Sequence, residues 1–291
     1  MTEPPLGSQL SSQSPAPDVQ PSLAAPPPLG SQSSSPFEVH EAVTRFRGPT
    51  TAGLWLRSLV FNAVLFTTMT MLLITYLPLL AGPPKILRRA VRAWVKLIDA
   101  SLRGIIGLSW RIEGREHMPV TPAILACKHQ STWETFFFFL LFPEASYVLK
   151  KELLSIPLWG WYAQRSGVVV VDRSAGARAL KRMISDGRRL VAAGRTLVVF
   201  PEGTRTQPGA RPPLMPGVAA LASRLNAPVV PVALNSGVFW GRRAILKYPG
   251  TITVRFLPHL PADLPKPEFL RELEVRIDDA SDDLARNPDR T

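Results

Sequence analysis

Short runs of consecutive apolar residues recur along the chain beyond residue 110, and each has about the length of a β-strand. The runs are rich in Val, Ile, Leu and Ala, and they cover residues 123–127, 146–150, 168–172, 196–200, 229–234 and 251–257. Continuous apolar runs of this kind are typical of strands that are buried on both faces of a sheet. The pattern therefore predicts a β-sheet core covered by helices on either side.

Between these runs, residues 177–193 follow a helical period. Apolar residues from Leu180 to Val191 share one face, Arg and Lys residues lie on the other, and Gly194 is placed to end the helix. A last helical pattern with mixed charges covers residues 268–286, and we expect it at the periphery of the domain. Strands that alternate with helices predict an α/β fold.

The longest apolar stretch, residues 59–80, carries no formal charge. About 20 apolar residues in a helix span the hydrocarbon core of a bilayer, so this stretch predicts a membrane helix. Asn62, Pro78 and several threonines lower its hydrophobicity, which leaves open a re-entrant or half-buried helix.

Basic residues are more frequent after this stretch than before it. Five lie within residues 85–96, whereas three lie within residues 45–57. By the positive-inside rule this bias places the following domain on the cytoplasmic face, which is the inner membrane if the source is a bacterium. Residues 86–108 interleave these basic residues with apolar ones. Either this segment lies on anionic headgroups, or it packs on the protein with a solvated basic face.

The first 36 residues are rich in proline and serine and have few side chains that could build a core. This composition predicts a disordered tail, to which we assign residues 1–50. The remaining segments are then a membrane-associated helical segment over residues 51–109, an α/β domain over residues 110–262 and a C-terminal helix over residues 263–291.

Charge adds a constraint on the partner. The chain of 291 residues has a formal net charge of +12 at pH 7, which favours an anionic membrane surface or a nucleic acid. The apolar stretch favours the membrane, and we recognise no nucleic-acid-reading motif. The single cysteine, Cys127, excludes an internal disulfide and a cysteine-based metal site.

His129 is one of only four histidines, and it stands five residues before Glu134, where an apolar run gives way to an aromatic one. A neutral imidazole with a carboxylate partner can act as a general base. On a regular helix the two side chains would point ~140° apart, so His129 must precede the helix. Residues 131–134 match the S-x-x-E capping box, which would begin the helix at Ser131. Glu134 is therefore either the partner of His129 or only a helix cap.

The segment FPEGTR, residues 200–205, follows another apolar run. Ligands bind at the carboxyl ends of strands in α/β sheets, and Pro201 ends this strand. Gly203 permits a tight turn, and the planar guanidinium of Arg205 can hold a phosphate with two hydrogen bonds. The alternative is a polar loop with a surface Arg–Glu pair.

Other polar residues end neighbouring runs. Lys150 and Lys151 end one, and Asp172 with Arg173 ends another, so several cations could converge on one rim of the sheet. Cys127 lies two residues before His129 and is a candidate nucleophile. A buried core residue is the favoured interpretation, because nothing nearby in the sequence would lower the thiol pKa.

With both clusters identified, the sequence resembles the glycerolipid acyltransferase superfamily, and most closely the 1-acylglycerol-3-phosphate acyltransferases. Four ordered blocks carry the resemblance: KHQSTWE at 128–134, LKKELLSIPLWGWYAQRSGVVVVDR at 149–173, FPEGTR at 200–205 and VPV at 230–232. The first is similar to the family's His-x4-Asp signature, and FPEGTR matches without deviation. The N-terminal apolar segment and basic helix also resemble the family's membrane-binding region.

The resemblance implies transfer of a fatty acyl group from acyl-CoA or acyl-carrier protein to the sn-2 hydroxyl of lysophosphatidic acid, giving phosphatidic acid. His129 would take the hydroxyl proton, and Glu134 would orient the ring and stabilise the imidazolium. Arg205 and Lys150 would bind the substrate phosphate, in a site completed by Glu202, Gly203 and Thr204. The resemblance implies no metal and no cofactor beyond the acyl donor as co-substrate. Membrane lipids are the expected partners, and the oligomeric state is left open.

The sequence departs from the family at one position of the signature, because Glu134 stands where Asp is usual. We expect activity to survive, since a small backbone or rotamer shift offsets the extra methylene. Acylation of another lysolipid or of glycerol 3-phosphate, and a non-catalytic lipid-binding relative, are the alternatives.

Overall fold

The computed structural model describes residues 35–120, 122–225, 227–261 and 263–289. Its first element, α1 (Pro36–Arg47), lies within the predicted tail, so the prediction was wrong for these residues. Ser35 and Glu38 form a capping box at the start of α1, and the helix buries Val39 and Val43, which explains why it is ordered. The rest of the predicted tail, residues 1–34, lies outside the described residues.

The core is a mixed sheet in the order β1-β7-β6-β2-β5-β3-β4. All neighbouring pairs are parallel except β6 with β7, which is antiparallel. The strands are β1 (Leu108–Glu113), β2 (Ile124–Cys127), β3 (Ser146–Lys150), β4 (Val169–Val171), β5 (Leu197–Val199), β6 (Val229–Leu234) and β7 (Gly250–Phe256). The predicted α/β fold and its six apolar strands are confirmed.

The prediction missed β1, which pairs with β7 at one edge of the sheet. Its sequence, LSWRIE, alternates apolar and polar residues, and only Leu108 is fully buried. An edge strand with a partly exposed face lacks the continuous apolar run that marked the others. The sequence interpretation had assigned its first residues to the preceding helix.

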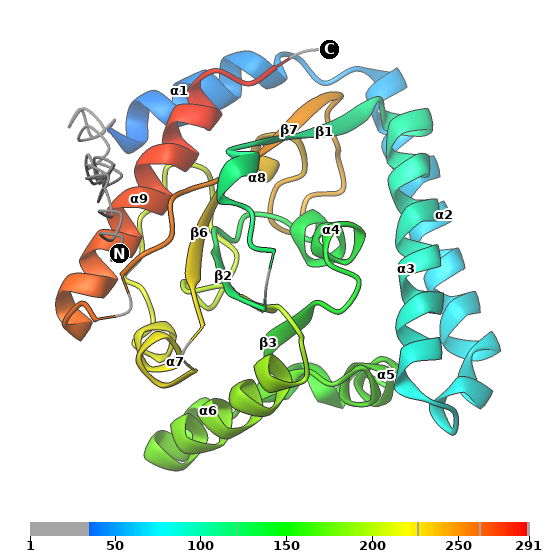
Figure 1. Cartoon of the computed structure of the whole chain (residues 1–291). Helices are drawn as coiled ribbons and strands as arrows, with labels where there is room; N and C mark the ends of the chain where they lie inside the picture. The colour runs from blue at the N-terminus through cyan, green and yellow to red at the C-terminus, as the bar shows by residue number, and fades with distance from the viewer. Residues whose placement is uncertain (1–34, 121, 226, 262, 290–291) are drawn as a thin grey trace, which may run out of the picture. The chain divides into compact units, whose positions relative to one another are not determined.

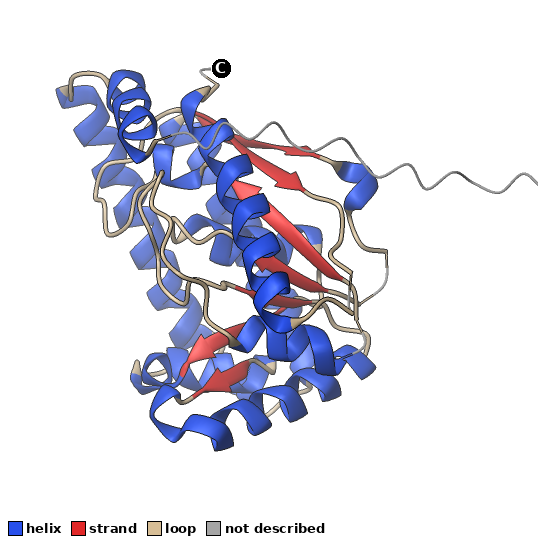
Figure 2. Ribbon diagram, turned by 90° about the vertical axis from the view of Figure 1, so that its left-hand side faces the viewer, coloured by secondary structure: helices blue, strands red, loops and turns tan. Residues whose placement is uncertain are grey.

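Helices cover both faces of the sheet (Figures 1 and 2). Beyond α1 they are α2 (Ala52–Thr75), α3 (Pro84–Ser101), α4 (Trp133–Leu141), α5 (Trp159–Ser166), α6 (Gly176–Ala192), α7 (Gly217–Leu225), α8 (Ser236–Phe239) and α9 (Lys266–Arg286). Short 3-10 turns cover Leu77–Leu80, Arg115–His117, Lys151–Ser155 and Arg173–Ala175, and a π turn covers Leu102–Ile106. The predicted helix over 177–193 corresponds to α6.

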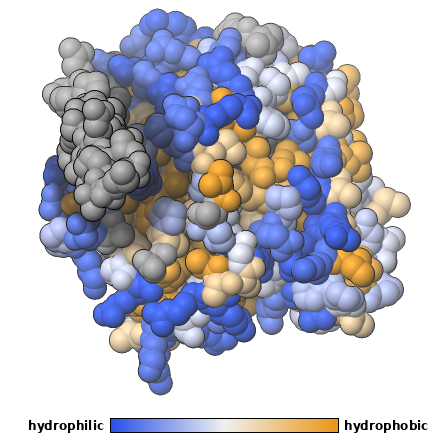
Figure 3. Space-filling view, viewed as in Figure 1, coloured by the Kyte–Doolittle hydropathy of each residue, from blue (hydrophilic) through white to orange (hydrophobic). Residues whose placement is uncertain are grey.

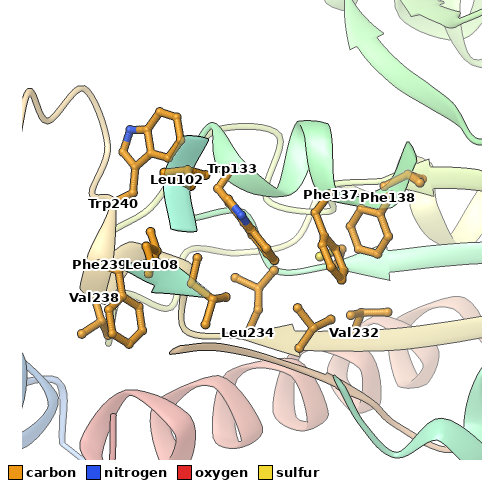
Figure 4. Close-up of a cluster of buried hydrophobic side chains, with 14 of the residues drawn as sticks. Leu102, Leu108, Trp133, Phe137, Phe138, Val232, Leu234, Val238, Phe239 and Trp240 are labelled. Atoms are coloured by element: carbon orange, nitrogen blue, oxygen red, sulfur yellow. The ribbon is translucent and has the colours of Figure 1, made fainter. Parts of the chain in front are cut away.

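The two faces of the sheet belong to two apolar cores. Along β2, Ile124 and Ala126 face the core formed with α6, α7 and α9, whereas Leu125 and Cys127 face the core that includes α4. This alternation with complete burial is what the continuous apolar runs predicted. Figure 4 shows the second core, where aromatic side chains of α4 point toward β6.

The helix α2 contains most of the apolar stretch and is, among the described residues, the one helix long and apolar enough to cross a membrane. Its first half nevertheless contacts the α/β domain. Ser58 and Phe61 are fully buried, and Asn62 donates a hydrogen bond to the carbonyl of Ile245. Lys247 donates to Asn62 from a buried position, and burial lowers the pKa of its amine to about 8. These contacts favour the half-buried alternative for this part of the helix.

The basic helix α3 is also fastened to the domain. Arg88 is almost fully buried and forms an ion pair with Glu144 at 2.7 Å, and Arg92 donates to the carbonyl of Leu140. Lys85, Arg89 and Lys96 stay exposed. α3 therefore packs on the protein and keeps an exposed basic face.

We predicted a peripheral C-terminal helix, but α9 is part of the core. It buries Phe269, Leu273 and Ile277 against the sheet and α7. The prediction underestimated α9 because its mixed charges concealed this apolar stripe, and because buried Asp278 and Asp282 pair with basic residues of the domain. By contrast, the cationic face of α6 is exposed, and strongly hydrophilic residues cover its region at the lower left of Figure 3.

Candidate active site

The candidate residues lie where parallel strands end. Strands β2, β5, β3 and β4 are neighbours and run in the same direction, so their carboxyl ends share one edge of the sheet. His129 follows β2, the FPEGTR loop follows β5, Lys150 ends β3 and Arg173 follows β4. This is the edge at which α/β sheets bind ligands.

His129 and Glu134 are in contact. The Nδ1 atom of His129 lies 2.9 Å from Oε1 of Glu134, whose side chain is fully buried, whereas the His129 side chain is 14% exposed. A carboxylate can only accept, so Nδ1 carries the proton and the lone pair is on Nε2. In a neutral ring, this tautomer leaves the lone pair of Nε2 free to take a proton.

The capping alternative turns out not to exclude this pairing. The backbone N–H groups of Gln130 and Ser131 both donate to Oε1 of Glu134 at 2.7 Å, so the carboxylate also holds the turn before the helix. The predicted start at Ser131 was wrong, because α4 begins at Trp133 and the Ser131 hydroxyl accepts from the Trp133 N–H instead. One carboxylate oxygen thus serves both the helix start and His129.

The rest of His129 is held from several sides. Its ring stacks on Phe200 with centroids 3.9 Å apart and planes 15° apart. Its backbone N–H donates to Oε2 of Glu202 at 2.8 Å, and its carbonyl accepts from the N–H of Thr206 at 2.8 Å. The FPEGTR loop therefore fixes both the plane of the ring and the position of the backbone.

A buried ionic cluster holds Glu202, the side chain that accepts from the His129 backbone. The amine of Lys128 lies 2.6 Å from Glu202 and 2.7 Å from Asp278 of α9, and all three side chains are at most 2% exposed. It also donates to the carbonyl of Ala210. Burial raises the pKa of Asp278 to about 6, because two carboxylates share one ammonium in a place that water does not reach. Lys128 and Asp278 were missed by the sequence analysis.

Glu202 was predicted to belong to the phosphate site, but its side chain points inward. Both of its oxygens are engaged, one with Lys128 and Thr206 and the other with the His129 N–H. A buried carboxylate would also repel a phosphate. Glu202 instead supports the turn of residues 129–132 that precedes α4, which we call the His129 turn.

The cations form what we call the cation rim, consisting of Lys150, Arg173 and Arg205. Arg205 donates to the Thr132 hydroxyl at 2.6 Å, which places it beside the His129 turn, and burial lowers the pKa of its guanidinium. Arg173 donates to the carbonyl of Gly203, which has a φ of +65°. This left-handed backbone conformation favours glycine, and a Cβ at position 203 would also displace the Arg173 guanidinium, which lies 1.9 Å from where the Cβ would stand.

Two predicted phosphate ligands have weaker structural support. Lys150 ends β3 at the same edge, but no described residue is recorded as its hydrogen-bond partner, and Thr204 is exposed. Neighbouring Lys151 instead pairs with Asp172 at 2.8 Å, and this contact lowers the pKa of Asp172 to about 2. The structure thus brings Arg205 to the His129 turn and leaves Lys150 and Thr204 near the edge.

Cys127 is fully buried, and burial together with Glu134 and Glu202 raises the pKa of its thiol well above the usual value. This supports its interpretation as a core residue. Among the described residues, no group of three or more His, Cys, Asp or Glu side chains is arranged to hold a metal ion.

Comparisons with known proteins found sequences similar to this chain. Residues 109–235 match the family model described as Acyltransferase. A 1-acyl-sn-glycerol-3-phosphate acyltransferase of Pseudomonas aeruginosa is 36% identical over 191 residues, which are 66% of this chain and 74% of the relative. One from Cocos nucifera is 30% identical over 164 residues, which are 56% of this chain and 53% of the relative. The chain thus spans about half the length of that plant protein.

The fold has a counterpart among solved structures. The crystal structure of the 1-acyl-sn-glycerophosphate (LPA) acyltransferase PlsC from Thermotoga maritima superimposes with a TM-score of 0.64, covering 79% of this chain and 96% of that chain at 19% sequence identity. This likeness concerns the fold, whereas the Pseudomonas relative extends over two thirds of the chain in sequence. The chain belongs to the acyltransferase family that includes the 1-acyl-sn-glycerol-3-phosphate acyltransferases.

Proposed function

We propose that the protein is a membrane-bound acyltransferase that moves a fatty acyl group from acyl-CoA or acyl-carrier protein to the sn-2 hydroxyl of lysophosphatidic acid, giving phosphatidic acid. The observation that carries this proposal is the hydrogen-bonded pair of His129 and Glu134, with Arg205 beside it. Relatives that are 36% and 30% identical to this chain bear the name 1-acyl-sn-glycerol-3-phosphate acyltransferase, which supports the choice of acceptor.

The geometry of the pair suits direct transfer. Nε2 of His129 takes the proton of the acceptor hydroxyl as its oxygen attacks the thioester carbonyl. Glu134 accepts the Nδ1 hydrogen bond and stabilises the imidazolium that forms. When the tetrahedral intermediate collapses, the carbon–sulfur bond breaks and the imidazolium returns the proton to the leaving thiolate. The scheme needs no acyl-enzyme, which fits a buried Cys127 with a raised thiol pKa.

The cation rim would bind the phosphate of the acceptor. Arg205 offers a planar fork next to the His129 turn, and Lys150 adds a charge at the neighbouring strand end. Holding the phosphate would position the sn-2 hydroxyl and so reduce the entropy that must be lost in the transition state. Gly203 and Thr204 would shape this loop.

Membrane attachment would come from α2 and the helix α3 beside it. Trp55, Leu59, Phe66 and Met71 of α2 are exposed, as expected of a helix that meets lipid rather than water. The acceptor and the product both reside in a bilayer, so this attachment would keep the site close to them. The basic residues after α2 favour a catalytic domain on the cytoplasmic face.

A panel assay tests the proposal. The purified protein is offered radiolabelled lysophosphatidic acid, other lysophospholipids and glycerol 3-phosphate, each with acyl-CoA and with acyl-carrier protein. We expect phosphatidic acid from lysophosphatidic acid with at least one donor. Faster acylation of another acceptor would replace lysophosphatidic acid as the substrate. Absence of transfer to every acceptor would support a lipid-binding relative without catalysis.

A further inference from the structure

The far oxygen of Glu134 has its own donor. The hydroxyl of Ser236 lies 2.8 Å from Oε2, and both side chains are completely buried. Ser236 is the first residue of α8 and stands just outside residues 109–235, which match the family model. The bond joins two positions that are 102 residues apart in sequence.

The two oxygens of Glu134 accept hydrogen bonds from different donors. Oε1 accepts from Nδ1 of His129 and from the N–H groups of Gln130 and Ser131, whereas Oε2 accepts from Ser236. Three donors on one oxygen fix its position but leave the carboxylate plane free to turn about it. The contact at the second oxygen removes that freedom. Hydrogen bonds to a buried carboxylate are also among the stronger ones in proteins.

The segment that carries Ser236 is itself anchored. The amide of neighbouring Asn235 donates to the carbonyl of Leu284 in α9 and accepts from the N–H of Thr253 in β7. On the other side, the Gly237 N–H donates to Oε1 of Gln130 at 3.0 Å. A Cβ at position 237 would lie 2.9 Å from Cβ of Gln130, so α8 approaches the His129 turn very closely.

We propose that Ser236 is a positioning residue, which orients Glu134 so that a glutamate, with its extra methylene, holds His129 in the catalytic geometry. The inference rests on the proposed acyl transfer. An aspartate at 134 would be one methylene shorter and could not hold the same contacts to Ser236, the turn and His129 without a shift of the backbone. The role of Ser236 is therefore specific to glutamate.

The test compares Ser236→Ala, Ser236→Cys, Glu134→Asp and the Glu134→Asp/Ser236→Ala double variant. Ser281→Ala is the matched control, since Ser281 is equally buried and accepts from the Leu234 N–H without contacting Glu134. We expect Ser236→Ala to lower kcat by about ten-fold or more with an unchanged KM, as for loss of one hydrogen bond to a charged group. Ser236→Cys, which keeps a weaker donor, should fall between wild type and Ser236→Ala.

In the Glu134→Asp background, Ser236→Ala should change kcat by less than about two-fold, because the shorter carboxylate no longer depends on the hydroxyl. Equal losses in both backgrounds, a wild-type kcat for Ser236→Ala, or the same kcat loss in Ser281→Ala would overturn the proposal. Melting temperatures establish that each variant is folded.

A second readout does not need turnover. The Nδ1 proton of His129 should give a downfield proton resonance in the wild type that shifts or broadens in Ser236→Ala and persists in Ser281→Ala. An inactive wild type would refute the acyltransferase function, whereas this resonance still reports on the orientation of Glu134. A resonance unaffected by Ser236→Ala would contradict the positioning role.

Discussion

The His129 corner and the cation rim share one edge of the sheet but differ in how many hydrogen bonds hold their side chains. The corner comprises His129 and Glu134 together with the side chains that hold them, which are Phe200, Glu202 and Ser236. At the corner, Glu134 accepts four hydrogen bonds and Glu202 is engaged through both oxygens. On the rim, Arg205 and Arg173 each donate to one oxygen of the protein, and Lys150 has no recorded hydrogen-bond partner among the described residues.

The difference corresponds to two tasks. Proton transfer requires a ring that is already in place, because misplacement lengthens the path of the proton. Recognition of a phosphate requires donors that are still available when the ligand arrives. The comparison therefore predicts that changes at the corner lower kcat or stability, whereas changes on the rim act on the binding of a phosphorylated acceptor.

The largest effect is expected for His129→Ala. Removal of the general base should lower kcat by about a thousand-fold, within the usual range for general base catalysis. Folding should be retained, because the ring is 14% exposed at the sheet edge and its backbone contacts do not depend on the side chain. Turnover is measured with lysophosphatidic acid, and circular dichroism confirms the fold. Undiminished turnover would show that His129 is not the general base.

Lys128→Met tests the cluster below the corner. It leaves the carboxylates of Glu202 and Asp278 buried without a cation, which should lower the free energy of unfolding by about 3–5 kcal/mol. Denaturant titration at pH 7 measures the loss. Asp278→Asn is the control and should cost less, because Lys128 keeps Glu202. A loss below about 1 kcal/mol would show that the cluster contributes little.

Asp278 in the same cluster determines whether stability rises or falls with pH. The pKa of Asp278 is raised from 3.8 to about 6, so the folded state binds this proton more tightly than the unfolded state. Its contribution to stability is present below about pH 4 and is lost as the pH rises through 6. Without the charge of Lys128, the folded state of the variant binds the Asp278 proton still more tightly, so lowering the pH from 7 to 5 should stabilise Lys128→Met more than the wild type. The loss caused by Lys128→Met should therefore be smaller at pH 5 than at pH 7.

Glu134 variants distinguish an orienting carboxylate from a mere cap. Glu134→Ala should lower kcat by about a hundred-fold, because the ring loses its tautomer and its support. Glu134→Asp should stay within about ten-fold of the wild type, since a carboxylate remains. Both are measured at saturating acceptor. Equal kcat for Glu134→Ala and the wild type would assign Glu134 to the helix start alone.

Arg205→Ala has the smallest expected effect and tests the rim. The KM for lysophosphatidic acid should rise about ten-fold, whereas the KM for a monoacylglycerol, which lacks the phosphate, should change less. Arg188→Ala is the matched control, because Arg188 lies on the exposed face of α6 and donates to the Arg224 carbonyl. Equal losses with both acceptors would argue against phosphate binding by Arg205.

Local sequence patterns predicted the elements in which all residues are buried to a similar degree. Strand β2 is buried on both faces, so its apolar run was visible in the sequence, whereas Arg111 and Glu113 interrupted the pattern of edge strand β1. Helix α1 was missed inside a polar segment, although Ser35 and Glu38 carry a local signal, the capping box, that could have found it.

The site was predictable only as far as its signals are local. The spacing of His129 and Glu134 and the composition of FPEGTR could be read along the chain. The contacts of Lys128 with Asp278 and of Glu134 with Ser236 join positions 150 and 102 residues apart. No periodicity specifies such pairs, because they depend on how α9 and α8 return to the sheet. A lysine at the end of a fully apolar strand was the one signal that a buried partner existed.

The specificity of the wild-type protein for its acceptor tests most directly whether the His129 corner catalyses acyl transfer and the cation rim binds the phosphate. Acyl transfer to lysophosphatidic acid is compared with transfer to a monoacylglycerol of the same chain length, using the same thioester donor. We expect formation of phosphatidic acid and a kcat/KM at least about ten-fold higher for lysophosphatidic acid. No transfer to lysophosphatidic acid, or equal kcat/KM values for the two acceptors, would contradict it.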